Sequence, residues 1–250
     1  MKSLAIILGA TIFLSSCGGT LDTQGILKDI NAVANDAGAG GIGTSTTPTQ
    51  NEIVSGLKQA LQQGTNKGSD KLSAVDGFFK DAAVKILMPP EAQNVESQLR
   101  QLGMGNMVDQ AVLSFNRAAE SASGQAKPIF INAITQMNFS DAMGILKGGG
   151  TSATDYIKRA CTSPLTAAFR PTVQQSLNNV NATKYWSDAM NVYNKIPFVT
   201  PVNTDLAGYV TDKAIQGIFL KVADEERNIR ANPLQQASAL LQKVFGYATK

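Results

Sequence analysis

The sequence has 250 residues, with 22 Lys and Arg against 19 Asp and Glu, and it contains no histidine. The absence of histidine excludes a Ser-His-Asp triad, a Cys-His pair, His-ligated zinc and a histidine pH switch. A net charge of +3 is too small for a protein that binds nucleic acid by neutralising phosphates, so no nucleic-acid partner is expected.

The N-terminus has the pattern of an export signal. Lys2 provides a basic start, and Leu4–Leu14 is an uncharged apolar run of 11 residues, which is too short to span a bilayer. The run ends in Leu14-Ser15-Ser16-Cys17, which resembles a bacterial lipobox. This resemblance implies cleavage after residue 16 and attachment of acyl chains such as palmitate to Cys17. The alternative is an ordinary signal peptide with a chance cysteine.

The resulting organisation has three parts. Residues 1–16 are a signal peptide, residues 17–48 a lipidated N-terminus with a flexible tether, and residues 49–247 a helical domain. Lipid anchoring would make the membrane a partner without a transmembrane helix. Residue 18 is Gly rather than Asp, and similarity to the enterobacterial sorting rule favours the outer membrane. We expect the protein on the periplasmic side of that membrane rather than on the cell surface.

The tether combines an amphipathic stretch with a polar linker. Ile26, Ile30 and Val33 are spaced for a short helix within Leu21–Ala37. The Gly- and Thr-rich residues 38–48 cannot form a core and are typical of a flexible linker.

The helical domain opens with a strong helix signal. Thr49 and Glu52 have the spacing of a capping box, in which each side chain binds a free backbone amide. Gly64 and Gly68 continue the apolar stripe of this first helix. Small residues on an apolar face predict close contact with another helix.

The remaining pattern predicts an all-α fold, a single multi-helix bundle of about nine helices. Val84–Met88 and Ile196–Val202 are extended, proline-bounded segments that could pair as one short two-stranded β-ribbon. Apolar periodicity, caps and breakers place the later helices at residues 91–102, 106–123, 128–137, 140–147, 151–160, 165–180, 183–193, 205–230 and 234–245.

From Glu52 onward the chain resembles domain-of-unknown-function family 4197, a family of uncharacterised bacterial envelope proteins. The resemblance implies a mostly helical domain in an exported protein and transfers no activity. The stretches that carry it include Asp76-Gly77-Phe78, Asn116-Arg117-Ala118-Ala119-Glu120, Asp141–Gly149, Pro164–Pro171 and Glu225–Arg230.

Five residues are candidates for ligand binding. Asn116 and Glu120 lie one helical turn apart, with Arg117 beside them and apolar neighbours on both sides. Such a constellation can bind a carboxylate or phosphate, but it more often ties helices together. Arg170 is a second candidate of the same kind. Trp186, flanked by Tyr185, is either core or the lip of a groove for an apolar ligand.

The other chemical signals are weak. Once Cys17 is lipidated, Cys161 is alone; it is either a thiol activated by nearby Lys158 and Arg159 or, as we prefer, a small residue half-buried near a helix end. The run Asp224-Glu225-Glu226 lacks the spacing of a cation loop. We therefore expect no metal, no cofactor and no catalytic residue.

Two functions remain from different classes. The first is a non-catalytic lipoprotein that binds or scaffolds another envelope protein, which predicts an apolar surface patch. The second is a carrier or sensor of a small amphiphilic or anionic ligand, which predicts an enclosed apolar cavity with Arg117 or Arg170 at one end. An enzyme is a third option, disfavoured because the commonest general base is absent.

Overall fold

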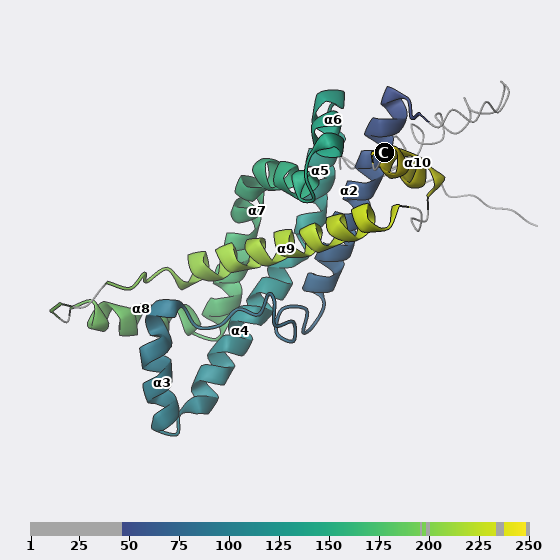
Figure 1. Ribbon diagram of the computed structural model, residues 1–250. Helices are drawn as coiled ribbons and strands as arrows, with labels where there is room; N and C mark the ends of the chain where they lie inside the picture. Colours follow the sequence, from purple (N-terminus) through teal and green to yellow (C-terminus); the bar gives the residue numbers. More distant parts are fainter. Residues whose placement is uncertain (1–46, 196, 199–200, 234–237, 249–250) are drawn as a thin grey trace, which may run out of the picture. The chain divides into compact units, whose positions relative to one another are not determined.

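The computed structural model describes residues 47–195, 197–198, 201–233 and 238–248, all within one compact unit that begins at Ser45. These residues form nine α-helices and one short 3-10 helix, with no strand (Figure 1). This confirms the predicted all-α fold. The elements are α2 (Gln50–Ser73), η1 (Pro90–Ala92), α3 (Gln93–Gln101), α4 (Gly105–Ser123), α5 (Ala126–Thr135), α6 (Phe139–Lys147), α7 (Ser152–Asn179), α8 (Ala182–Tyr193), α9 (Leu206–Ala231) and α10 (Ala239–Ala248).

The signal peptide, Cys17, the helix expected within 21–37 and the linker up to residue 46 lie outside the described residues. Within the described ranges, no helix combines the length and the apolar character that crossing a membrane requires.

Helix α2 begins and packs as the sequence predicts. The Glu52 amide donates to Thr49 Oγ1 at 3.2 Å, and the Thr49 amide donates to Glu52 Oε2 at 2.7 Å, which confirms the capping box. A Cβ placed on Gly68 would lie 3.5 Å from Lys221 Cβ on α9. The small residues of α2 therefore do allow close packing against another helix, and that helix is α9.

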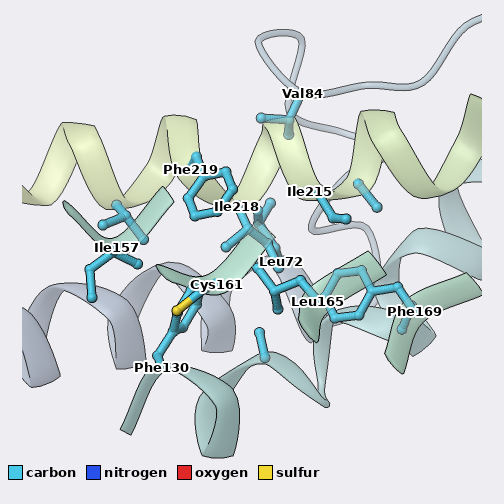
Figure 2. Close-up of a cluster of buried hydrophobic side chains, with 14 of the residues drawn as sticks. Leu72, Val84, Phe130, Ile157, Cys161, Leu165, Phe169, Ile215, Ile218 and Phe219 are labelled. Carbon is cyan, nitrogen blue, oxygen red and sulfur yellow. The ribbon is translucent and has the colours of Figure 1, made fainter. Parts of the chain in front are cut away.

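Helices α7 and α9 form the centre of the fold. Helix α9 packs against α7, α2 and α4, and Figure 1 shows it crossing these helices. In Figure 2 the side chains of Ile215, Ile218 and Phe219 on α9 face Ile157 and Leu165 of α7. The domain is thus built around one extended apolar layer between these two long helices.

The structure corrects the prediction of two separate helices around Pro164. Helix α7 runs unbroken from Ser152 to Asn179 with Pro164 and Pro171 inside it. An interior proline costs a helix about 3 kcal/mol. A continuous apolar stripe, spaced every four residues and fully buried, outweighs this cost. It consists of Ile157, Cys161, Leu165, Phe169, Val173 and Leu177.

The proposed β-ribbon is also corrected. Residues 84–88 belong to an irregular segment without strand structure, and part of the expected partner segment lies outside the described residues. The backbone of Ile86 pairs with the side chain of Asn116 instead of with another strand. At the C-terminus, the helix expected over 234–245 is observed as Ala239–Ala248, and residues 234–237 lie outside the description.

Candidate functional site

Asn116 binds the backbone of a distant segment. Its Oδ1 accepts from the Ile86 amide at 2.9 Å, and its Nδ2 donates to Ile86 O at 2.8 Å and to Val112 O at 2.7 Å. The side chain is completely buried. Both amide hydrogens are used, so Asn116 has no donor left for a ligand.

Glu120 has a similar role one turn further along α4. Its Oε1 accepts from the amides of Phe78 and Phe79 at 3.1 and 3.3 Å. Its Oε2 accepts from Arg117 Nη1 at 2.6 Å. A buried carboxylate is stable here because two backbone amides and a guanidinium replace the water it has lost.

Arg117 bridges Glu120 to Asp76. Its Nη2 donates to Asp76 Oδ1 at 2.7 Å, and the two carboxylates, Glu120 more than Asp76, raise the pKa of Arg117. Asp76 has a φ of 69°, the left-handed region that side chains rarely adopt. Its pKa is lowered mainly by Lys80 and then by Arg117.

The predicted trio of Asn116, Arg117 and Glu120 is therefore brought together, and its contacts are with its own chain. Together these residues fix segment 76–86 against α4. The interpretation that the trio ties elements of the fold together describes these contacts better than a free carboxylate- or phosphate-binding site.

Arg170 lies apart from this trio. Its Nη2 donates to Asp205 Oδ2 at 2.8 Å, and Asp205 also caps α9 by accepting from the Gly208 amide. Burial tends to raise the pKa of Asp205, but the Gly208 amide and Arg170 together lower it. Both ionic side chains remain partly exposed. The pair connects α7 to the start of α9.

Trp186 is mostly buried on α8, and its Nε1 donates to Asn203 O at 3.1 Å. The neighbouring Tyr185 is 65% exposed. Trp186 forms part of the wall of a groove while most of its side chain is in the core, so it has features of both positions that the sequence left open.

This groove has a mostly apolar lining and a volume of about 770 Å3. It runs between the α3–α4 pair and α8, and it opens to solvent. No residue of α3 is buried, although Val95 and Leu99 of that helix face the groove. Its other large apolar side chains include Met88, Met107, Val108, Phe115, Val180, Tyr185, Trp186, Met190 and Leu206.

One of the two candidate arginines lines the groove, and the other lines a separate pocket beside it. Arg117 contributes to its lining. Arg170 lines a smaller polar pocket of about 260 Å3. The two hollows share Trp186 and Leu206, so the tryptophan lies between them.

Sequence reasoning missed the α3–α4 wall of the groove. The signal available was the apolar face of α3 together with Met107 at the start of α4. Periodicity identifies such a face but does not distinguish a side chain that faces the core from one that faces a groove.

Cys161 and the acidic residues 224–226 have packing and capping contacts within the fold. Cys161 is completely buried inside α7, which corrects the expectation of a half-buried residue near a helix end, and burial raises its pKa to about 11. Glu226 binds the first turn of α7. Among the described residues, no three Asp, Glu or Cys side chains lie close enough together to hold a metal ion.

Comparison with known proteins gives one match. A family model described as Protein of unknown function (DUF4197) covers residues 47–246. Neither the curated proteins nor the solved structures include a significant match.

Proposed function

The chain belongs to the family described as Protein of unknown function (DUF4197), and from this premise we propose that it is a lipid-anchored envelope protein that binds an amphiphile. The apolar part of the amphiphile lies in the groove between α3, α4 and α8. The proposal assigns no reaction to the protein.

The single observation that carries the proposal is the groove itself. Its volume of about 770 Å3 falls within the range of about 300–1,000 Å3 that small-molecule sites occupy. Its walls expose Val95, Leu99 and Met107 to water. An acyl chain would remove this apolar surface from water, which is the main source of binding free energy for such ligands.

The charges at the groove restrict the polar end of the ligand. Arg117 is paired with Glu120 and Asp76, and Arg170 is paired with Asp205. Neither guanidinium is an uncompensated positive charge. Of the amphiphilic or anionic ligands that the sequence suggested, we therefore propose an amphiphile with a neutral or zwitterionic head group.

The anchor rests on the sequence. A lipid on Cys17 and a tether up to residue 48 would keep the groove near a membrane, where amphiphiles are concentrated. The proposed location is the periplasmic side of the outer membrane.

The experiment uses Trp186, the only tryptophan in the chain, as a reporter inside the groove. We expect a short amphiphile with a brominated acyl chain to quench its fluorescence in a saturable way. Ala111→Phe, which fills the groove at one of its lining positions, should weaken binding at least tenfold. Ala231→Phe, at the exposed end of α9, is the matched control. Absence of saturable quenching in the wild-type protein would overturn the proposal.

The second candidate is binding of another envelope protein, which was the first of the two functions predicted from the sequence. The observation that favours it is the exposure of Met107, Val180 and Tyr185, all along the groove, because exposed apolar patches often mark interfaces. A photo-crosslinking residue at Tyr185 should then capture one defined envelope protein, and the same residue at Tyr247 should not. Equal capture from both positions would count against this candidate.

A further inference from the structure

The turn between α3 and α4 carries apolar side chains into solvent. Leu102 is 75% exposed and Met107 61% exposed, and Met104 is also exposed. Gly103, with a φ of 78°, reverses the chain between Leu102 and Met104. The six residues from Leu102 to Met107 include no charged side chain.

The turn is at the end of a hairpin that projects from the rest of the fold. Figure 1 shows α3 and α4 meeting at a tip away from α7 and α9. The principal contacts of α3 are with α4 and η1. The turn can therefore reach a surface that the body of the domain does not touch.

The charges of the hairpin form one cluster at the edge of this tip, where Arg100 Nη1 would lie 3.5 Å from a Cβ placed on Gly105. Arg100 pairs with Glu96 and Asp109, both at 2.9 Å, which leaves this group with a net charge of −1. No other charged side chain of α3 or the first turn of α4 stands between this group and the tip. Residues 102–107 themselves carry no charge, and the arginine beside them is neutralised by its two carboxylate partners.

We propose that residues 102–107 insert into the interfacial layer of a lipid bilayer and place the mouth of the groove against it. This inference rests on the proposed function, because it supplies the route by which an amphiphile would enter. Met107 of this segment and Leu99, which precedes it, both line the groove. The apolar surface is therefore continuous from the tip into the groove.

A bilayer fits this surface better than a protein partner does. A stable protein interface uses roughly 20–30 residues a side, whereas the tip offers three exposed apolar side chains. Insertion into a bilayer requires only apolar area and no matched hydrogen bonds. Two of the three side chains are methionines, which adapt to an irregular surface.

The first experiment locates the tip in the lipidated full-length protein in phosphatidylcholine vesicles. Leu102→Cys is labelled with an environment-sensitive fluorophore, which is selective because Cys17 carries lipid and Cys161 is buried. We expect a blue shift and quenching by spin-labelled lipid. Val75→Cys, at an apolar position that is 79% exposed, is the control and should show neither. The same response at both positions, or at neither, overturns the inference. A blue shift of the label at position 102 that arises without lipid, because another protein binds there, also overturns it.

The second experiment separates this inference from the proposed function. Leu102→Asp with Met104→Asp should slow transfer of a brominated phospholipid from vesicles to Trp186 about tenfold or more. Binding of a short, water-soluble brominated amphiphile should be unchanged. If the short amphiphile binds but transfer is unaffected, the tip inference is wrong and the groove function stands. If the label at 102 enters the bilayer but the short amphiphile does not bind, the groove function is wrong and the tip inference stands.

Discussion

Glu226 on α9 binds Thr154 in the first turn of α7 twice, through its backbone amide and through its hydroxyl, both at 2.8 Å from Oε2. The other carboxylate oxygen accepts from the Ala153 amide at 3.0 Å. Thr151, the residue at the cap position, makes no side-chain cap of its own. A carboxylate from another helix therefore satisfies the free amides at the start of α7 and interacts favourably with its dipole.

Replacing Glu226 should destabilise the domain strongly. Glu226→Gln replaces one carboxylate oxygen with an NH2 group, which donates. Either the Ala153 amide and Arg230 or the Thr154 amide then loses its acceptor. Because the site is buried, we expect the free energy of unfolding to fall by about 2–4 kcal/mol in urea denaturation. Glu225→Gln, which removes a partly exposed pair with Lys67, should cost less than about 1 kcal/mol. Similar losses for the two variants would contradict the capping role.

Removing the amide of Asn116 should release segment 84–88. Asn116→Leu keeps the size of the side chain but leaves the buried N–H and C=O of Ile86 without partners. We expect a loss of about 2–4 kcal/mol in the free energy of unfolding. Hydrogen exchange at the Ile86 amide should accelerate more than at core amides of α9. The exposed Asn132→Leu on α5 is the control, and equal protection of Ile86 in both variants would refute the role.

Acid should weaken the ion pair of Asp81. The buried Lys221 is the main cause of the lowered pKa of Asp81, and its Nζ lies 2.7 Å from Oδ2. Because the pKa is lower in the folded state, the pair stabilises the protein above the unfolded pKa of about 3.9 and loses this effect as the pH falls through the folded pKa. Asp81→Asn should thus be clearly less stable than wild type at neutral pH.

The difference between Asp81→Asn and wild type should shrink toward zero in strong acid, as measured by urea denaturation across pH. Asp70→Asn, at a mostly exposed carboxylate, should show a small difference at every pH. A difference for Asp81→Asn that stays constant into strong acid would show that packing, rather than ionisation, causes it.

The thiol of Cys161 should be unreactive in the folded protein. Burial raises its pKa to about 11, so at pH 8 it is protonated as well as inaccessible. We expect a disulfide reagent to modify it only at the rate of unfolding, and at once in urea. The raised pKa also means that stability declines as the pH rises above about 9, because the unfolded state then loses the proton first. Rapid modification without denaturant would support the alternative that Cys161 is an activated thiol.

The sequence predicts the fold where the information is local. The capping box of Thr49 and Glu52 and the small residues Gly64 and Gly68 depend on neighbours along one helix, and both predictions are confirmed. Helix α7 was divided incorrectly because local rules weigh Pro164 heavily, while the burial of six stripe residues depends on the rest of the fold.

The candidate site was predictable only in part for the same reason. Helical spacing places Asn116 and Glu120 on one face of α4. Their partners, Ile86 and Phe78, lie 30 and 42 residues away, and no short-range pattern identifies them. The carrier hypothesis required an enclosed apolar cavity, whereas the structure has a groove that opens to solvent. This groove depends on α3, α4 and α8 together, and no local pattern predicts it.

The way in which α4 holds segment 76–86 bears on how this protein can vary. The hydrogen bonds of Asn116 and Glu120 to this segment are made with the backbone of Ile86, Phe78 and Phe79. Substitutions at exposed positions of the segment, such as Ala82, should leave its path unchanged as long as the two α4 side chains persist. In related proteins the exposed positions of the loop should therefore tolerate divergence, whereas a change at either α4 position should require a compensating change in the loop's conformation.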